Sequence, residues 1–301
     1  MARSVVAPGI PETMDIPGAE LQRIVDAALV EDLGWGDITT DNLVPEAAAA
    51  RASVVYRTPG IVCGIPVLTR VFQAIDPRVV VDALAREGDR AEKGAVVAIV
   101  RGSARSILKG ERVALNFVQR MAAVATATAQ YVNAIGDLPT HVIDTRKTTP
   151  GLRVLERYAV RVGGGRNHRF NLSDGALVKD NHLVALRNQG IGTVEALRLL
   201  RDRIPHTARM QVEVDRLDQI PEVLEAGVDA ILFDNFTPDE VREAVRMVGG
   251  RAVTEMSGGV KLETVRAYAE AGVNVVSSGA LTHSTPALDV ALDFELDTGD
   301  R

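Results

Sequence analysis

Cysteine, aromatic residues and positive charge are all scarce in this chain of 301 residues. A single cysteine, Cys63, excludes an internal disulfide framework and a cysteine-rich metal site. Aromatic residues make up 4% of the chain, too few for the stacking platforms that bind nucleic-acid bases. The net charge of −6 leaves no general basic field to attract DNA or an anionic membrane. We therefore expect neither a nucleic-acid partner nor a membrane partner.

Long apolar runs are missing as well. No run reaches membrane-spanning length, and residues 1–17 lack the apolar core of a signal peptide, so the expected location is the cytoplasm. Hydrophobic residues make up 46% of the chain and charged residues 25%, which is typical of a globular protein. Residues 1–17 are rich in proline and small side chains and are predicted to form a loose lead-in.

The first third of the chain is predicted to be a small α+β unit. Apolar residues at helical spacing predict a helix over residues 19–33, which Gly34 can end. Residues 51–104 are predicted to be strands, because short β-branched runs alternate there with glycines. Cys63 lies in an apolar run and is predicted to be a small buried residue. A long helix is predicted over residues 110–135.

From residue 140 onward, strand-like runs alternate with helical ones. The predicted strands are 140–144, 176–180, 209–215, 229–234, 252–257 and 273–278, and the predicted helices are 151–162, 192–203, 217–226, 238–248 and 261–271. The strands are continuously apolar, as expected of parallel strands buried on both faces. No glycine-rich G-x-G-x-x-G turn opens the series, which disfavours a dinucleotide-binding fold. The pattern favours a β/α barrel, which need not be complete.

Polar side chains follow each of these strands. Catalytic residues of β/α barrels lie where strands end and the following loops begin. The residues at those positions are Asp144 to Lys147, Lys179 and Asp180, Glu213, Asp234 and Asn235, Glu255 to Ser257, and Ser277 to Gly279. These side chains would surround one mouth of the barrel, although a chance set of solvated loop residues is the alternative.

Positive charge is concentrated early in the barrel. Between residues 144 and 182, eight Lys and Arg residues stand against four acidic residues. Three of them, Arg153, Arg157 and Arg161, step by four along one helix and are predicted to form a solvated face. Four other basic residues flank strands or glycine-rich turns: Arg146, Lys147, Arg169 and Lys179. Since Arg and Lys bind carboxylates and phosphates, this half of the barrel is predicted to bind a multiply anionic ligand.

Histidine 168 can be interpreted in two ways. It stands in the string GGGRNHR, over residues 163–169, where three glycines permit unusual backbone shapes. It can be a structural histidine, or a ligand-binding one beside Arg169.

Acidic and glycine-rich strand ends dominate the later part of the barrel. Glu213 and Asp234 are one β/α unit apart, and such a pair can hold a divalent cation, bind sugar hydroxyls or act as general acid and base. Ser257-Gly258-Gly259 and Ser277-Ser278-Gly279 follow the last two strands, where β/α barrels commonly bind phosphate through backbone N–H groups.

Taken together, these strings resemble the quinolinate phosphoribosyltransferase family. The similarity covers nearly all of the chain after residue 20, and DTRKT, GGG-x-NHR and KDNH in this order are specific. The matching segments are EDLGWGDITT (31–40), GERVALN (110–116), DTRKTTPGLR (144–153), YAVRVGGGRNHR (158–169), LVKDNH (177–182), VEVD (212–215), LFDNF (232–236), SGGV (257–260) and SSGALTHS (277–284).

The resemblance implies an α/β sandwich domain over residues 1–117 and an incomplete, seven-stranded α/β barrel over 118–287. The tail, 288–301, is expected to return to the sandwich domain. The resemblance also implies a homodimer whose active site is completed by Arg112 of the partner subunit. Whether such dimers assemble into hexamers is left open.

The same resemblance assigns roles to the candidate residues. Quinolinate would be bound by Arg112, Arg146, His168, Arg169 and Lys179. Lys147 would face quinolinate and phosphoribosyl pyrophosphate, as a catalytic residue together with Glu213 and Asp234. Those two carboxylates would hold the ribose hydroxyls and Mg²⁺, directly or through water. The 5′-phosphate would be bound by Ser257, Gly258, Gly259 and Gly279.

The resemblance implies transfer of phosphoribosyl to quinolinate with loss of CO₂, giving nicotinate mononucleotide in NAD biosynthesis. One alternative is a related transferase acting on nicotinate or another anionic heterocycle. The full set of five basic side chains suits the dianion quinolinate better than the monoanion nicotinate. A catalytically inactive binding or scaffold protein is the other alternative, against which the intact Lys147, Glu213 and Asp234 argue.

Overall fold

The computed structural model describes residues 16–296, which form two compact units. The first unit comprises the described chain up to Ala129, residues 148–164 and the residues from Ser284 onward. The second comprises Gln130–Lys147 and Gly165–His283. None of the helices in residues 16–296 combines the length and hydropathy of a membrane span. The predicted lead-in, residues 1–17, falls almost wholly outside the described part.

The two units are interleaved along the chain, whereas the sequence predicts two boundaries, one between residues 117 and 118 and one between 287 and 288, where the tail begins. The helix α4 (Ala104–Ile135) runs through the first of these positions, and the first unit extends to Ala129. The helix α5 (Arg153–Val162) follows the first strand of the barrel, but its buried face packs in the core of the first unit.

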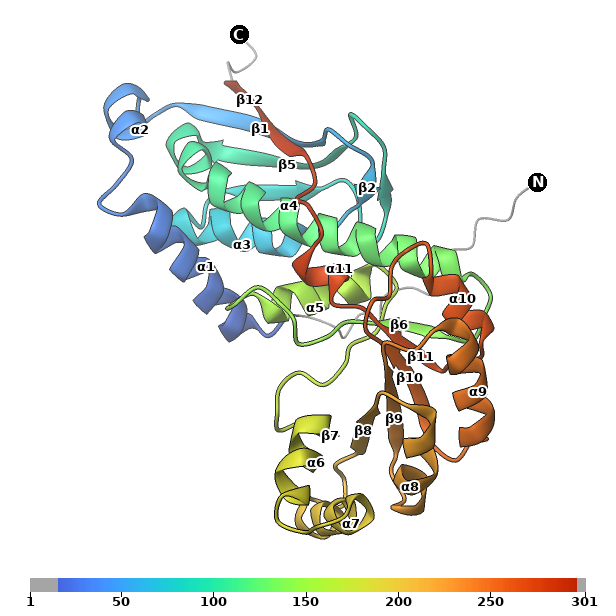
Figure 1. Cartoon of the computed structure of the whole chain (residues 1–301). Coiled ribbons are helices and arrows are strands. Elements are labelled where there is room, and N and C mark those ends of the chain that lie inside the picture. Colours follow the sequence, from blue (N-terminus) through green and yellow to red (C-terminus); the bar gives the residue numbers. More distant parts are fainter. Residues whose placement is uncertain (1–15, 297–301) are drawn as a thin grey trace, which may run out of the picture. The chain divides into compact units, whose positions relative to one another are not determined.

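The first unit contains a four-stranded antiparallel sheet (Figure 1), with the strand order β12-β1-β5-β3. Its strands are β1 (Ala49–Tyr56), β3 (Val80–Ala83), β5 (Val96–Ser103) and β12 (Val290–Leu296). Strands β1, β3 and β5 confirm that residues 51–104 contain strands built from β-branched runs. The C-terminal strand β12 pairs with β1 along its whole length, and residues 297–301 of the expected tail lie outside the described residues. A second, two-stranded sheet joins β2 (Gly60–Ile61) to β4 (Arg90–Ala91).

Helices of the first unit cover this sheet. They are α1 (Gly18–Leu33), α2 (Ile38–Leu43), α3 (Ile65–Ile75), α4 and α5. The prediction that residues 51–104 are all strand is wrong at α3, where the β-branched run IPVLTRVFQAI misled it. Pro66 fits the first turn of a helix, and Leu68 and Phe72 are buried at helical spacing. Cys63 is fully buried, as predicted.

Arginines on α5 do not form the solvated face that the sequence predicts. Arg153, Arg157 and Arg161 are only partly exposed. Nε of Arg153 donates a hydrogen bond of 3.0 Å to the hydroxyl of Thr148. The prediction failed because residues of α5 enter the core of the first unit, so the helix has little free surface.

The second unit is built on a parallel sheet with the order β6-β11-β10-β9-β8-β7. Its strands are β6 (His141–Ile143), β7 (Ala176–Val178), β8 (Met210–Val214), β9 (Ala230–Asp234), β10 (Val253–Ser257) and β11 (Val275–Ser277). A single residue, Arg166, continues the sheet beyond β6 through an isolated parallel bridge to Ile143. The predicted incomplete α/β barrel is confirmed, with its seventh strand reduced to this bridge.

Helices line the outside of the parallel sheet, as Figure 1 shows for α8, α9 and α10. The helices are α6 (Asp180–Arg187), α7 (Thr193–Arg203), α8 (Ile220–Glu225), α9 (Pro238–Val248), α10 (Val265–Glu270) and α11 (Ala280–His283), with a 3₁₀ turn at Leu217–Gln219. The sequence predicts α7, α8 and α9 closely but misses α6 and α11. The helix expected from residue 261 begins only at Val265, so the Ser257-Gly258-Gly259 turn is not itself a helix N-terminus.

Asp76 at the end of α3 makes the stability of the first unit sensitive to acid. Hydrogen bonds from Arg78, then a weaker one from the Ser106 hydroxyl, lower the pKa of this carboxyl to about 2 from its usual 3.8. A lowered pKa in the folded state stabilises the fold above pH 3.8, and this contribution is lost as the pH falls through 3.8 towards 2. We expect Asp76→Asn to flatten the fall in unfolding free energy across that interval, measured by urea denaturation.

Asp293→Asn is the matched control, because Asp293 pairs with Arg57 at an exposed site where ion pairs contribute little. The role of Asp76 would be contradicted if the unfolding free energy of Asp76→Asn fell with pH as steeply as that of the wild type. It would also be contradicted if both variants flattened this fall equally.

Candidate functional site

A cavity of ≈ 580 Å³ opens at the carboxyl ends of the parallel strands. All the predicted site residues of the barrel line it: Arg146, Lys147, His168, Arg169, Lys179, Glu213, Asp234, Ser257, Gly258, Gly259 and Gly279. The remaining predicted residue, Arg112, lies exposed on α4 in the first unit. The strand ends therefore bring together side chains that are up to 133 positions apart in the sequence (Arg146 to Gly279).

Alternation along the strands explains why polar groups reach this cavity from apolar runs. Successive side chains of a strand point to opposite faces. Glu213 on β8 and Glu255 on β10 both lie in register with Leu232 on β9, and all three line the cavity. Their neighbours Val212 and Thr254 are buried on the opposite face. Alternation thus brings Glu213 and Glu255 to the cavity although both lie within largely apolar strands.

The loop after β6 is held by the buried carboxylate of Asp144. This carboxylate accepts a hydrogen bond of 2.6 Å from the Asn167 amide and one of 2.7 Å from the backbone N–H of His168. It therefore joins the DTRKT loop to the glycine-rich string, which gives Asp144 a structural role. The hydroxyl of Thr282 donates a 2.8 Å bond to the carbonyl of Lys147, which holds the other end of the loop.

Two guanidinium groups lie close together on one side of the cavity. Burial lowers the pKa of Arg169 from its usual value, and the positive charge of Arg146 lowers it further. Nη1 of Arg169 donates a 2.7 Å hydrogen bond to the carbonyl of Gly175, which fixes the direction of this side chain. Since like charges repel and an anion between them relieves that repulsion, this side of the cavity favours a carboxylate or phosphate ligand.

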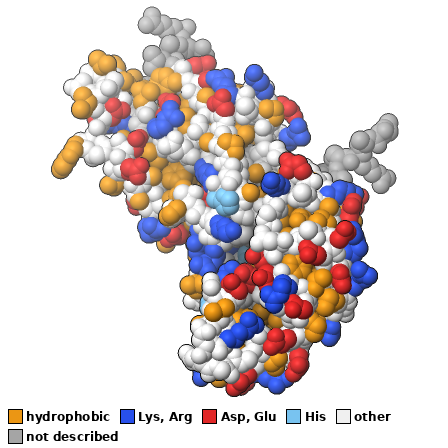
Figure 2. Space-filling model, in the orientation of Figure 1, with side chains coloured by type: hydrophobic (Ala, Val, Ile, Leu, Met, Phe, Trp, Pro, Cys, Tyr) orange, Lys and Arg blue, Asp and Glu red, His pale blue; other side chains and the backbone are white. Residues whose placement is uncertain are grey.

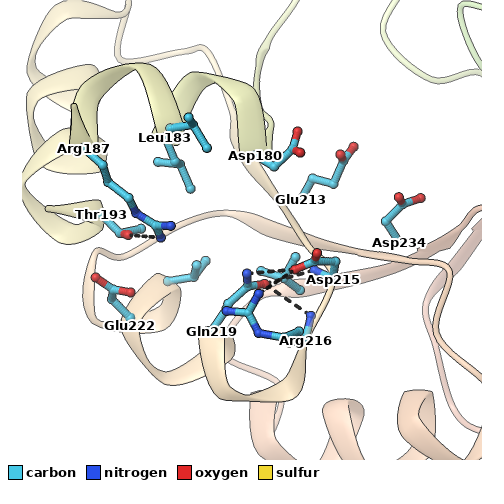
Figure 3. Close-up of a pocket in the computed structure, with 13 residues that line it drawn as sticks. Asp180, Leu183, Arg187, Thr193, Glu213, Asp215, Arg216, Gln219, Glu222 and Asp234 are labelled. Atoms are coloured by element: carbon cyan, nitrogen blue, oxygen red, sulfur yellow. Dashed lines mark hydrogen bonds and ion pairs between the residues drawn. The ribbon is translucent and has the colours of Figure 1, made fainter.

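Two carboxylates occupy the neighbouring strand ends. Glu213 and Asp234 extend to the same side of the sheet, with Asp180 at the start of α6 beside them (Figure 3). Glu213 forms an ion pair with Lys179. The Asn235 amide donates a 2.9 Å hydrogen bond to Asp234.

The charges around Asp234 change its acidity. Burial raises the pKa of the Asp234 carboxyl above its usual value, and the negative charge of Glu213 raises it further. Lys179 and Lys147 lower the pKa, and Asp215 makes a smaller contribution that raises it. A divalent cation would relieve the repulsion between the two carboxylates, so the pair is suited to one.

Protein ligands alone do not complete a metal site here. In residues 16–296, no group of three or more His, Cys, Asp or Glu side chains is placed to hold a metal ion. Glu213 and Asp234 do fit Mg²⁺, because this ion usually keeps several waters and binds through one or two carboxylates and substrate phosphates. A second cavity of ≈ 270 Å³, shown in Figure 3, adjoins the same two carboxylates and adds Asp180 and Asp215 to its lining.

Two glycines allow close packing at the rim. Gly258 has a φ of +81°, and a Cβ placed there would lie 2.4 Å from the Asn235 amide oxygen and 2.8 Å from a carboxylate oxygen of Asp234. A Cβ on Gly279 would lie 2.9 Å from Cδ of Lys147. Any side chain at either position would displace a polar group of the cavity.

Sequence reasoning assigned no role to four residues that shape the site. Asn235 was not assigned a role, although an Asn directly after a strand-ending Asp is one of the few residues that tolerate its φ of +61°. Glu255 and Gln211 point inward from apolar strands, and His283 lines the cavity beside Gly279. The alternation of side chains along a strand was the signal that would have shown Glu255 and Gln211 to point into the cavity.

Comparison with known proteins supports the assignment of the whole chain. Residues 37–122 match the quinolinate phosphoribosyl transferase N-terminal domain, and residues 124–293 match the C-terminal domain. A probable nicotinate-nucleotide pyrophosphorylase [carboxylating] of Bacillus subtilis is 39% identical over 92% of this chain and 94% of its own. The Mycobacterium leprae nicotinate-nucleotide pyrophosphorylase [carboxylating] is 42% identical over 89% of this chain and 94% of its own. The crystal structure of NadC from Streptococcus pyogenes superposes with a TM-score of 0.89 at 38% identity, covering 94% of this chain and 99% of that one.

The acidity of Asp234 gives a test of the charge arrangement without substrate. We expect Glu213→Gln to lower the pKa of Asp234 towards its ordinary value, because the substitution removes a negative neighbour and releases Lys179 from its ion pair. The pKa can be measured by ¹³C NMR titration of labelled aspartate carboxyl groups. Asp215→Asn is the control and should lower the pKa by less. An unchanged pKa in Glu213→Gln, or a larger shift in the control, would refute this arrangement.

Proposed function

This chain belongs to the quinolinate phosphoribosyl transferase family, and on that premise we propose that it transfers phosphoribosyl from 5-phosphoribosyl 1-pyrophosphate to quinolinate. The products are nicotinate mononucleotide, pyrophosphate and CO₂, a step of NAD biosynthesis. One observation carries the proposal: a single cavity is lined by the neighbouring guanidiniums of Arg146 and Arg169 and by the neighbouring carboxylates of Glu213 and Asp234. This sorting suits a reaction between a dicarboxylate and a sugar phosphate that carries a metal ion.

Quinolinate binds on the basic side of the cavity. Arg146 and Arg169 take its two adjacent carboxylates, because paired guanidiniums match a dianion in charge and geometry. Lys179, already paired with Glu213, stands between this region and the acidic side. His168 lines the cavity beside Arg169 and is only partly exposed.

The phosphoribosyl donor binds on the acidic side. Glu213 and Asp234 accept hydrogen bonds from the ribose hydroxyls and hold Mg²⁺, directly or through water. The turns at Ser257-Gly258-Gly259 and Gly279 offer backbone N–H groups to the 5′-phosphate. Mg²⁺ held by these two carboxylates would supply positive charge to the pyrophosphate oxygens.

The reaction needs positioning and charge stabilisation rather than a protein nucleophile. The lone pair of the pyridine nitrogen forms the bond to C1 of the ribose, while the bond from C1 to the pyrophosphate oxygen breaks and its electron pair leaves with pyrophosphate. Two anionic substrates must approach each other, and Lys147 lies at the rim of the cavity on the loop after β6, near Gly279. Its positive charge offsets their repulsion and the charge that develops on the leaving group.

Decarboxylation follows from the same transfer. Once the ring nitrogen is quaternary, the carbon–carbon bond to the 2-carboxylate can break, and its electron pair is stabilised beside the positive nitrogen. The carboxylate departs as neutral CO₂, and a proton takes its place on the ring carbon. A partly desolvated cavity favours this step, because a neutral product needs less solvation than the anion.

A homodimer is proposed to complete the site. Arg112 is exposed on α4, and we assign it to the quinolinate site of the partner subunit. An apolar surface supports a subunit contact in the first unit: Val30, Trp35, Ile38 and Leu43 are each at least 76% exposed. Figure 2 shows hydrophobic side chains standing out over α2 and the turn before it. Assembly of dimers into hexamers and the cytoplasmic location stay predictions.

A turnover assay tests the proposed activity. Purified protein is mixed with phosphoribosyl pyrophosphate, Mg²⁺ and either quinolinate or nicotinate, and mononucleotide formation is followed. We expect turnover with quinolinate, equal amounts of CO₂ and nicotinate mononucleotide, and loss of activity after chelation of Mg²⁺. Turnover with nicotinate but none with quinolinate would show that nicotinate, and not quinolinate, is the substrate.

The shared site is tested by mixing two inactive variants. Arg112→Ala and Lys147→Ala should each lower turnover by about 10²-fold or more. If each active site takes Arg112 from one subunit and Lys147 from the other, refolding an equal mixture should restore about a quarter of the wild-type rate, since half of the dimers then carry one intact site. Mixing Lys147→Ala with Asp234→Asn is the control, because both residues come from the same subunit and no site is restored. Absence of recovery in the first mixture would exclude the cross-subunit role of Arg112.

A further inference from the structure

The floor of the cavity contains an acidic side chain that the reaction described above does not use. Glu255 lies on β10, and its side chain is only 6% exposed. Its Oε1 atom is buried and has no hydrogen-bond partner among the described residues. Burying an acceptor without a partner costs free energy, so its presence in a substrate cavity calls for an explanation.

The other carboxylate oxygen faces His168. Nε2 of His168 lies 3.6 Å from Oε2 of Glu255, and the side chain of this histidine is 14% exposed. The amide of Gln211 donates a hydrogen bond of 2.7 Å to the same Oε2 atom. Gln211 reaches from β8 and Glu255 from β10, across the intervening β9. The carboxylate is therefore held in one direction, towards the imidazole.

The second ring nitrogen of His168 determines where its proton lies. Nδ1 accepts a hydrogen bond of 2.7 Å from the backbone N–H of Arg169. A ring nitrogen that accepts a hydrogen bond carries no proton, so this contact puts the proton on Nε2, the nitrogen that faces Glu255. The contact with Glu255 and the contact with Arg169 thus favour the same tautomer.

We propose that Glu255 is a positioning residue for quinolinate binding, holding the imidazole of His168 in the Nε2–H tautomer and in one orientation. Glu255 thereby also helps to position Arg169, because Nδ1 of the same imidazole accepts a hydrogen bond from the backbone N–H of Arg169. Glu255 acts through His168 and not on the substrate, as buried carboxylates commonly do beside functional histidines. The assignment of the affected substrate rests on the function proposed above.

Two substitutions at this position separate a positioning role from a packing role. Glu255→Leu removes both oxygens, whereas Glu255→Gln can keep a carbonyl oxygen facing Gln211 and His168. Thr254→Val is the matched control. Thr254 directly precedes Glu255 on β10, is buried on the opposite face, and donates a hydrogen bond from its hydroxyl to the Asn274 side chain. This control is expected to lower thermal stability without changing His168 or the KM for either substrate.

The readouts are the tautomer of His168 and the two KM values. ¹⁵N NMR of histidine-labelled protein gives the tautomer, and the signals among the five histidines are assigned with His168→Gln. The wild type and Glu255→Gln should show the proton on Nε2. Glu255→Leu should weaken this preference, which the Arg169 N–H alone then supports, and raise the KM for quinolinate by about tenfold, with the KM for phosphoribosyl pyrophosphate unchanged.

The wild-type spectrum alone can overturn the proposal, whether or not Glu255→Leu folds. A proton on Nδ1 in the wild type would do so. An unchanged tautomer in Glu255→Leu, with equal changes in both KM values, would show a packing role instead. These outcomes differ from a failure of the proposed function, which would appear as absent turnover in the wild type while the tautomer is as expected.

Discussion

The buried carboxylate of Asp144 is the interaction on which the geometry of the site depends. It ends the first barrel strand and accepts hydrogen bonds from the Asn167 amide and the His168 backbone N–H. It therefore joins the loop that carries Arg146 and Lys147 to the string that carries His168 and Arg169. A buried carboxylate needs several donors to be stable, so the two segments cannot separate without leaving a charge unsatisfied. The Asp144 carboxylate thus keeps Arg146 and Lys147 close to His168 and Arg169.

The opposite side of the cavity depends on strand register. Glu213 and Asp234 come from neighbouring parallel strands, so their carboxylates repel each other, and Lys179 and Lys147 offset that repulsion. The strands hold the carboxylates, and the loops hold most of the cations, of which Lys179 forms an ion pair with Glu213. We propose that this arrangement lets the same cavity bind a dicarboxylate and a metal-bound sugar phosphate.

Most of the barrel and its lining could be predicted from the sequence, because both depend on local patterns. Continuous apolar runs ending in polar residues identify parallel strands and their functional ends, and every barrel residue to which a binding or catalytic role was assigned lines the cavity. The helix α3 was missed because β-branched residues fit a strand equally well until tertiary packing decides. The surroundings of Arg153, Arg157 and Arg161 were missed because the core that α5 joins is formed by residues distant in sequence. Glu255 was noticed at a strand end, but its contacts with His168 and Gln211 come from other strands and loops.

The central claim is that the paired cations of the cavity are arranged for a dianion. Isothermal titration of the metal-free protein with quinolinate and with nicotinate tests it most directly, because the two ligands differ by one carboxylate. We expect quinolinate to bind at least about tenfold more tightly than nicotinate, since its second carboxylate gains charge-assisted hydrogen bonds that are each worth roughly 1.5–3 kcal/mol. Equal affinity for the two ligands, or tighter binding of nicotinate, would contradict it.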